Sequence, residues 1–248
     1  MNFNLEGKTA LVTGAGKGLG QGMVLGLARA GADIVGTDII HMDETRASVE
    51  KYGRNFYGIT ADLSCENVPD IAKKAIAAFG KIDILVNNAG IIRLSPAEDS
   101  SQSDYDAVMD LNVRCLYKLT QEIGRHMISN GYGKIINIGS ILSLAGGSEV
   151  APYVASKHAV AGITKALANE WGSKGVNVNA IAPGFMVTDN TYNLRQNTEA
   201  TDAITERIPL KRWGDARDLQ GPVVFLASDE ARFVNGHVLV VDGGYLNN

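Results

Sequence analysis

The chain has 248 residues, of which 45% are hydrophobic, and this suffices for one large domain with a sizeable core. Lys and Arg number 23 against 27 Asp and Glu, which gives a formal net charge of −4 at pH 7. This balance, together with the lack of a basic run, argues against a nucleic-acid surface or an anionic-membrane surface, and we expect neither partner.

Short apolar, β-branched segments alternate with longer helical patterns along the whole chain. Such apolar runs are typical of strands that are buried on both faces of a parallel sheet. Seven strands are expected, at residues 9–13, 32–38, 55–62, 82–90, 134–140, 176–184 and 237–244. Apolar residues three and four positions apart predict the clearest helices, at 67–79, 104–128 and 218–228. The alternation predicts an α/β fold, a single Rossmann-type domain over residues 1–248 with a doubly wound parallel seven-stranded sheet.

A glycine-rich turn, TGAGKGLGQG, follows the first predicted strand, with Gly14, Gly18 and Gly20 in the spacing GxxxGxG and Leu19 between the last two. Glycine permits a tight turn and the close approach of a pyrophosphate, and the N-terminus of the following helix attracts that anion. The alternative is a strand-to-helix turn without a ligand, because the spacing differs from the GxGxxG of the dinucleotide fingerprint.

Asp38 closes the second predicted strand, 24 positions after Gly14, where a carboxylate can accept hydrogen bonds from the ribose of a dinucleotide. Its charge would repel the extra phosphate of NADP and so favours NAD. Lys17 has the opposite effect, since a basic residue in the phosphate loop could meet that phosphate. We give Asp38 more weight and expect NAD as the cofactor.

Two further strand ends offer polar groups to a cofactor. Asp62 ends the third strand before Leu63, and it can either hold the adenine edge or cap the next turn. The NNAG segment at 87–90 ends the fourth strand, at the sheet edge where ligands bind in open α/β folds. The candidate contacts there are Asn88, Ala89 and Gly90. Alternatively, the asparagines serve backbone turns alone.

Four residues in the second half of the chain carry the candidate chemistry. Asn112 is a polar residue on an otherwise apolar helix face, where a buried amide needs partners. Ser140 ends the fifth predicted strand, and its hydroxyl can hold a substrate oxygen, although a cap or turn role is the alternative.

Tyr153 and Lys157 lie four residues apart in the helical stretch APYVASKHAV, so they project from one face. The unperturbed pKa of tyrosine is about 10. A nearby ammonium, helped by the positive charge of an oxidised nicotinamide, should lower it by roughly 2 to 3 units, worth about 3 to 4 kcal/mol. Tyr153 could then remove a proton from an alcohol or return one to a ketone. The alternative is an exposed helical pair, but the joint occurrence of all these features in one order favours a hydride-transfer site.

These motifs together resemble the short-chain dehydrogenase/reductase family over about residues 7 to 244. The residues that carry the resemblance are the TGxxxGxG turn, NNAG at 87–90, Asn112, Ser140, Tyr153, Lys157, Pro183 and Gly184. The resemblance implies an NAD(P) site to which Pro183, Gly184 and Thr188 contribute, with Thr188 at the nicotinamide amide. It also implies that Asn112 maintains a proton relay and that Ser140 positions the substrate. The resemblance further implies that Tyr153 is the acid/base and that Lys157 binds the nicotinamide ribose and acidifies Tyr153. Finally, it implies that the protein is a homotetramer.

A polar segment at 187–209 follows the sixth predicted strand, where a substrate lid would lie, with Arg212 and Trp213 packed at its base. Segments such as NNAGIIR and DNTYNLR resemble the branch of the family that oxidises the sugar acid 2-dehydro-3-deoxy-D-gluconate, with the gluconate-oxidising branch as the alternative. A sugar acid needs a cation for its carboxylate, and Arg93 and Arg195 are the candidates, although ordinary exposed arginines are the alternative.

Other readings of the sequence stay open. An NADPH-dependent ketoacyl or xenobiotic carbonyl reductase and a nucleotide sensor without catalysis are the competing functions. Cys65 and Cys115 form no metal-ligand spacing and the four histidines are scattered, so we expect reduced thiols and no metal. Neither an export signal nor a long apolar run is present in the sequence, and we expect a cytoplasmic protein.

Overall fold

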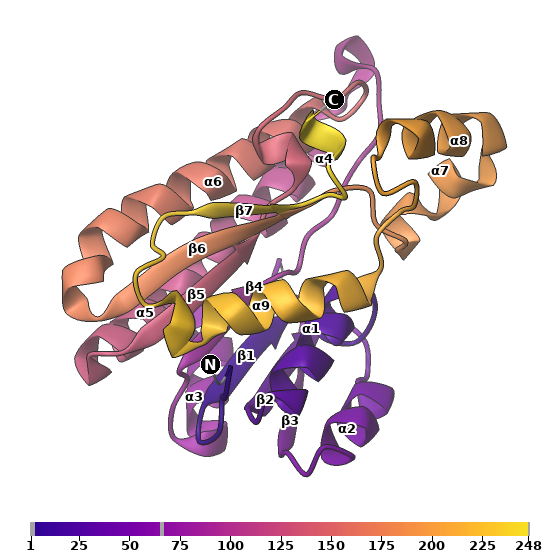
Figure 1. The fold of residues 1–248 in the computed structure, drawn as a ribbon. Helices are drawn as coiled ribbons and strands as arrows, with labels where there is room; N and C mark the ends of the chain where they lie inside the picture. The colour runs from indigo at the N-terminus through magenta and orange to yellow at the C-terminus, as the bar shows by residue number, and fades with distance from the viewer. Residues whose placement is uncertain (1–2, 65–66, 248) are drawn as a thin grey trace.

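A parallel sheet forms the centre of the computed structural model, which describes residues 3–64 and 67–247 (Figure 1). Its seven strands are β1 (Thr9–Thr13), β2 (Asp33–Asp38), β3 (Phe56–Thr60), β4 (Ile84–Asn87), β5 (Gly133–Ile138), β6 (Val176–Pro183) and β7 (Val238–Val241). They lie in the order β3-β2-β1-β4-β5-β6-β7, and all neighbours pair in parallel. The order reverses between β1 and β4, so their carboxyl ends flank the crevice where such folds bind nucleotides. The predicted fold class is confirmed.

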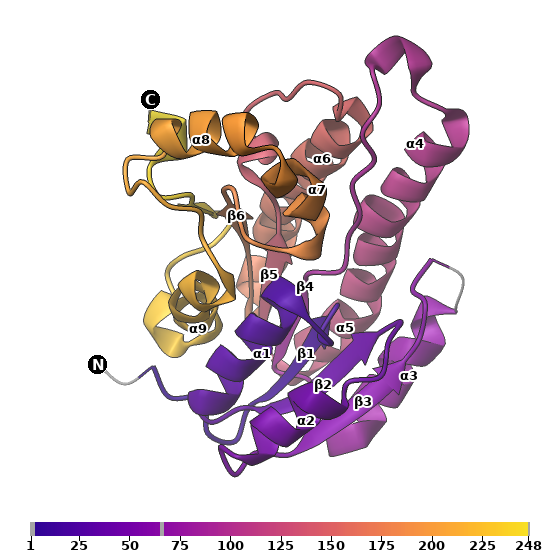
Figure 2. The same cartoon turned by 90° about the vertical axis from the view of Figure 1, so that its right-hand side faces the viewer.

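Helices cover both faces of the sheet (Figure 2). They are α1 (Gly18–Arg29), α2 (Asp43–Glu50), α3 (Val68–Phe79), α4 (Gln102–Met109), α5 (Leu116–Asn130), α6 (Ala151–Trp171), α7 (Tyr192–Gln196), α8 (Thr198–Arg207) and α9 (Gln220–Ala227). Successive side chains of β1 point to opposite faces, so Ala10 and Val12 join the core under α1 and α9, whereas Leu11 joins the core under α3 and α5. The two cores hold the sheet rigid and fix the positions of the strand ends.

The two edge strands differ from the prediction of strands buried on both faces. In β3, Tyr57 is exposed to 45%, and in β7 Val240 is exposed to 36%. Each edge strand has a neighbour on one side only, and the flanking helices do not cover it completely. The prediction holds for the inner strands β1, β4 and β5, whose residues are all buried.

The helix predicted at 104–128 is divided into α4 and α5 by a π-helical turn, η2 (Asp110–Cys115). A π-helical turn places an extra residue in the helix, and such turns are frequent at functional sites. Asn112 lies within η2 and is buried. The polar interruption of the apolar helix pattern therefore coincides with the change in helical geometry.

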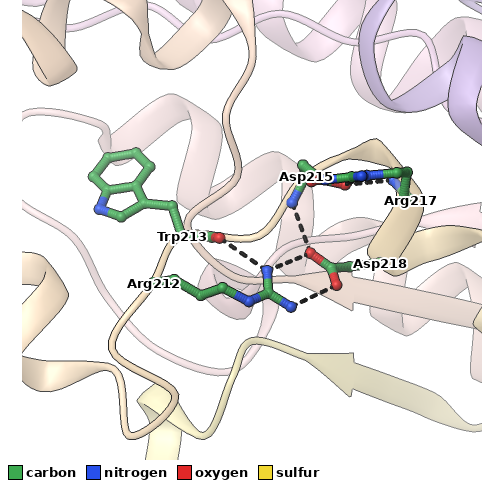
Figure 3. A network of polar contacts seen from close by, with 5 residues as sticks. All are labelled: Arg212, Trp213, Asp215, Arg217 and Asp218. Carbon is green, nitrogen blue, oxygen red and sulfur yellow. Dashed lines mark hydrogen bonds and ion pairs between the residues drawn. The ribbon is translucent and has the colours of Figure 1, made fainter.

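The polar segment at 187–209, here called the lid, forms η5 (Asp189–Thr191), α7 and α8 beyond the carboxyl ends of the strands (Figure 1). At its base, the Arg212 guanidinium donates to both carboxylate oxygens of Asp218, at 2.7 and 2.8 Å (Figure 3). Trp213 donates from Nε1 to the Thr205 hydroxyl at 3.1 Å and packs against the Phe185 ring. The prediction that Arg212 and Trp213 pack the base of this segment is confirmed.

Candidate active site

The glycine turn adopts a backbone that only glycine accommodates easily. Gly14 and Gly18 have φ values of 65° and 58°, in the left-handed region. A Cβ on Gly20 would lie 1.9 Å from the carbonyl oxygen of Gly14, so α1 passes directly against the turn, while Leu19 packs partly on the core. The first turn of α1 holds no acidic residue, and Lys17 does not cap it with its side chain. Nothing in that turn competes with an anion for the helix N-terminus.

The NNAG segment holds the glycine turn in place. The Asn88 side-chain amide donates to the carbonyl oxygens of Thr13 and Gly14, at 2.9 and 3.3 Å. The Thr13 hydroxyl accepts hydrogen bonds from the backbone N–H groups of Asn88 and Ala89, both at 2.9 Å. These bonds join the ends of β1 and β4. Asn88 therefore binds backbone groups with its side chain, which is one of the two roles that the sequence left open.

Two carboxylates end their strands beside this turn. Asp38 accepts from the backbone N–H of Gly16 at 2.8 Å and from that of Ile40 at 3.3 Å, which holds it at the end of β2 against the glycine turn. Asp62 accepts from the backbone N–H and the hydroxyl of Ser64, at 2.9 and 2.7 Å. The structure therefore supports the turn-capping interpretation of Asp62, and the following residue, Leu63, lies buried in the core.

Asn112 connects three parts of the site. Its carbonyl oxygen accepts from the backbone N–H of Ile91, and its amide donates to the carbonyl oxygen of Ile91, both at 2.9 Å. The same amide donates to the Ser156 hydroxyl at 3.0 Å, and Ser156 donates to the backbone oxygen of Tyr153 at 2.7 Å. Gly90 fits closely against this group, since a Cβ there would lie 3.0 Å from the Asn112 carbonyl oxygen. Asn112 thus fixes the position of α6 relative to the end of β4.

Ser156 is a site residue that the sequence analysis missed. It is fully buried within the YxxxK segment, and its hydroxyl has both a donor and an acceptor role. The signal that could have found it is a serine on the inward face of a helix, since a buried hydroxyl requires partners.

Ser140, Tyr153 and Lys157 lie together at the carboxyl end of β5, as predicted. Ser140 accepts from the backbone N–H of Leu142 at 3.1 Å, and its side chain acts to lower the pKa of the Tyr153 phenol. Lys157 is only 5% exposed, donates to the carbonyl oxygen of Ile138 at 2.8 Å, and lies 5.4 Å from the Tyr153 ring centroid. The site thus holds a hydroxyl, a phenol and an amine that face one another.

In the protein without a dinucleotide, Lys157 does not lower the pKa of Tyr153. The predicted lowering includes the charge of an oxidised nicotinamide, so it remains a prediction for the complex. Burial raises the pKa of Tyr153 to about 12, although the Ser140 side chain acts in the other direction. Burial also lowers the pKa of Lys157 to about 8. In the absence of cofactor, Lys157 therefore loses its proton before Tyr153 ionises as the pH rises. Spacing along the helix placed the two groups correctly, but desolvation by the surrounding protein decides their charges.

Three residues, 184–186, join the end of β6 to the lid. A Cβ on Gly184, next to Pro183, would lie 2.7 Å from the Cα of Asp242, so the two chain segments are in close contact there. Thr188 precedes η5, and its backbone N–H donates to the Thr191 hydroxyl at 3.1 Å. Lys17 reaches the lid from the glycine turn through an ion pair with Asp189.

The two arginines proposed for a substrate carboxylate both have partners within the chain. Arg93 forms an ion pair with Asp104 at 3.3 Å on the surface. Arg195 donates to the carbonyl oxygen of Thr188 at 3.1 Å, which keeps its guanidinium within the lid. The predicted clamp is therefore not assembled in this structure.

Residues 3–64 and 67–247 contain neither a candidate metal cluster nor a candidate membrane span. Within those ranges, no cluster of three or more His, Cys, Asp or Glu side chains could hold a metal ion. In the same described part of the chain, no helix is both long and apolar enough to cross a membrane. Cys115 is a free, buried thiol, and Cys65 lies outside the described residues.

Comparisons with known proteins agree with this geometry. A family model described as "Enoyl-(Acyl carrier protein) reductase" matches residues 14–246. The 2-dehydro-3-deoxy-D-gluconate 5-dehydrogenase of Dickeya dadantii is 52% identical over 246 residues, which cover 98% of this chain and 97% of the relative. This chain belongs to the short-chain dehydrogenase/reductase family.

Two solved members of the family match the fold closely, and both were solved with bound NADP. A candidate 2-deoxy-D-gluconate 3-dehydrogenase from Agrobacterium tumefaciens has a TM-score of 0.94 and 47% identity, covering 100% of this chain and 99% of that one. A candidate NAD(P)-dependent gluconate 5-dehydrogenase from Beutenbergia cavernae has a TM-score of 0.96 and 44% identity, covering 100% of both chains.

The residues of this chain fit the dinucleotide that the short-chain dehydrogenase/reductase fold implies. Gly14, Gly18 and Gly20 have no side chains, so their turn brings the backbone and the N-terminus of α1 directly to the crevice. Gly90 lies between this turn and the catalytic group, since a Cβ there would lie 3.0 Å from the Asn112 side-chain oxygen and 3.7 Å from the Lys157 amine. The glycine turn and the Tyr153 site are therefore both at the carboxyl edge of the sheet.

Proposed function

We propose that this protein is an NAD-dependent oxidoreductase that transfers a hydride between nicotinamide and a secondary alcohol or ketone of a sugar acid. The proposed substrate is 2-dehydro-3-deoxy-D-gluconate, on which the 52% identical relative acts by name. The observation that carries the proposal is the group formed by the buried Ser140 and Lys157 with the half-buried Tyr153, at the same sheet edge as the glycine turn.

The proposed roles follow from the contacts of each side chain. Ser140 holds the substrate oxygen, and Tyr153 takes the hydroxyl proton during oxidation or returns it during reduction. Lys157 binds the nicotinamide ribose with the N–H groups that Ile138 does not use. Asn112 supports the proton relay by holding Ile91 and Ser156 in place.

The raised pKa of Tyr153 sets an energetic requirement for this mechanism. Lowering that pKa from about 12 to about 8 requires about 5 kcal/mol, at about 1.4 kcal/mol per pKa unit. One positive charge on Lys157, 5.4 Å from the ring centroid, supplies about 3 kcal/mol at an effective dielectric constant of about 20. The remaining stabilisation would come from an oxidised nicotinamide, which would supply the hydride acceptor and a second positive charge when bound. Tyr153 is therefore expected to act as a base only in the complex with the oxidised cofactor.

The preference for NAD rests on Asp38. Its carboxylate is held against the glycine turn, where it would meet the extra phosphate of NADP. The two solved relatives contain NADP, so the coarser assignment, a nicotinamide dinucleotide, has the broader support. The proposed cofactor contacts are Gly14, Lys17, Gly18, Leu19, Gly20, Asp38, Asp62, Leu63, Asn88, Ala89, Gly90, Tyr153, Lys157, Pro183, Gly184 and Thr188.

For the substrate carboxylate, Arg93 is a better candidate than Arg195. The side chains of Arg93 and Asp104 are both exposed, and exposed ion pairs contribute little to stability. Arg93 can therefore leave Asp104 and bind another anion at a small cost in free energy. Arg195 would have to give up its bond to Thr188 within the proposed lid. The homotetrameric assembly is proposed from the family resemblance, and light scattering on the purified protein tests it.

Purified protein, sugar acids and both cofactors are sufficient to test the proposal. NADH or NADPH absorbance is followed over a panel that contains 2-dehydro-3-deoxy-D-gluconate, gluconate, their keto derivatives and a 3-oxoacyl thioester. The proposal predicts the highest kcat/KM for 2-dehydro-3-deoxy-D-gluconate with NAD. A higher value for gluconate would assign the alternative within the sugar acids, and a higher value for the thioester with NADPH would overturn the sugar-acid proposal.

A further inference from the structure

An ion pair joins the glycine turn to the lid across a separation of 172 residues in the sequence. The Lys17 amine lies 2.6 Å from a carboxylate oxygen of Asp189, at the start of η5. Lys17 belongs to the turn that would carry the dinucleotide, whereas Asp189 belongs to the segment proposed to cover the substrate. One contact therefore connects the part of the site that selects the cofactor with the part that closes over it.

The charges around Lys17 are already balanced by acidic groups of the chain. Asp189 raises the pKa of Lys17, and Asp38 acts in the same direction. Lys17 in turn lowers the pKa of Asp189, and Arg195 contributes to this effect from within the lid. Lys17 thus interacts with one carboxylate at the end of β2 and with another in the lid.

This arrangement affects the choice between NAD and NADP. In this fold the extra phosphate of NADP lies beside the residue that ends β2, and a nearby cation is needed to accept it. Lys17 is the cation of the glycine turn, but its nearest partner is Asp189. To bind that phosphate, Lys17 would have to share its charge between the phosphate and the lid carboxylate.

We propose that Asp189 is a positioning residue that holds Lys17 away from the extra phosphate of NADP, and so couples lid closure to the preference for NAD. This inference rests on the proposed nicotinamide dinucleotide site. With NAD bound, the Lys17–Asp189 pair stays intact and the lid remains attached to the glycine turn. With NADP bound, the phosphate competes with Asp189 for Lys17 and the start of the lid is loosened.

The expected effects are modest because both side chains are exposed, at 63% and 76%. Exposed ion pairs of this kind change equilibria by about two- to fivefold. Asp189→Asn should tighten NADP binding by about this factor and leave NAD binding within about twofold. Asp202→Asn, which removes an exposed carboxylate from α8 of the same lid, is the matched control and should leave both affinities unchanged.

A double-mutant cycle separates this mechanism from simple charge repulsion between Asp189 and the phosphate. Dissociation constants for NAD and NADP are measured by isothermal titration calorimetry, without substrate, for the wild type, Asp189→Asn, Lys17→Gln and the double variant. If Asp189 acts through Lys17, its substitution has no effect on NADP affinity in the Lys17→Gln background. An effect of equal size in both backgrounds would overturn the inference, as would an unchanged ratio of NADP to NAD affinity in Asp189→Asn. Asp189→Glu should restore the wild-type ratio.

Hydrogen exchange provides the second readout and needs no turnover. In the protein without cofactor, Lys17→Gln and Asp189→Asn should both increase amide exchange in peptides covering 187–196, whereas Asp202→Asn should not. In the wild type, saturating NADP should give faster exchange there than saturating NAD. Equal exchange in all these samples would overturn the coupling to the lid. A wild-type protein that binds neither dinucleotide would instead contradict the proposed function, so the two failures are distinguishable.

Discussion

Replacing Lys157 with methionine should make the protein more stable and remove its turnover. Burial lowers the pKa of Lys157 from 10.5 to about 8, which corresponds to about 3 kcal/mol of penalty on the folded state at about 1.4 kcal/mol per pKa unit. Methionine fills a similar volume without a charge. The carbonyl oxygen of Ile138 loses the hydrogen bond from Lys157 and is left without this partner, which costs about 1 to 3 kcal/mol. The net gain should therefore reach at most about 2 kcal/mol at pH 7, or about 4 to 8 °C in Tm.

The stability difference between Lys157→Met and the wild type should also depend on pH, which provides a second, independent test. Because the folded pKa of Lys157 is lower than the unfolded one, the penalty is complete below pH 8 and disappears as the pH rises through 10.5. The stability difference between Lys157→Met and the wild type should therefore shrink by about 2 kcal/mol between pH 7 and pH 10.

Urea denaturation followed by circular dichroism at one protein concentration measures both values, and Lys165→Met on the exposed side of α6 is the control. A Lys157→Met protein that is less stable than the wild type at pH 7, or a difference that does not change with pH, would refute the assignment of a desolvated amine. Turnover should fall below detection in Lys157→Met and remain in the control.

Three further predictions concern the cofactor, the buried network and the substrate. Asp38→Ala should raise kcat/KM with NADP relative to NAD at least about tenfold, since about 1.4 kcal/mol of charge repulsion is worth that factor, and unchanged selectivity in steady-state kinetics would contradict the charge argument. Ser156→Ala leaves the Asn112 amide with one partner fewer, so it should lower the free energy of unfolding by about 1 to 3 kcal/mol. The variant should also have a lower kcat with little change in the KM for NAD. Stability equal to that of the wild type in urea titrations would show that the hydroxyl is dispensable. Arg93→Gln should raise KM for the sugar acid and leave the KM for NAD unchanged, and an unaltered KM for the acid would exclude Arg93 from carboxylate binding.

Sequence patterns predicted the features that depend only on residues within the same turn, helix or strand. The four-residue spacing of Tyr153 and Lys157, the glycine positions of the turn and the placement of Ser140 at a strand end each depend on neighbours within a turn or strand. Apolar runs located the strands because the inner strands are buried on both faces. These features placed the fold correctly and brought Ser140, Tyr153 and Lys157 to one strand end, as expected.

The features that the sequence did not predict depend on tertiary packing. The pKa of Tyr153 is governed by desolvation, which several elements of the fold create together, and helix spacing contains no information about it. The Lys17–Asp189 pair joins segments 172 residues apart. The π-helical turn at Asn112 and the hydrogen bonds of Ser156 arise where η2 and α6 meet. Spacing rules describe one element at a time and therefore cannot locate such contacts.

Comparing Tyr153→Phe with the wild type tests the central claim most directly, with NAD binding measured by calorimetry and NADH formation from 2-dehydro-3-deoxy-D-gluconate measured by absorbance. The variant should bind NAD within about twofold of the wild type, because the phenol contributes little to binding, and its turnover should fall by about 100- to 10,000-fold, the range of a lost general base. A variant that retains turnover close to that of the wild type would show that another group exchanges the proton.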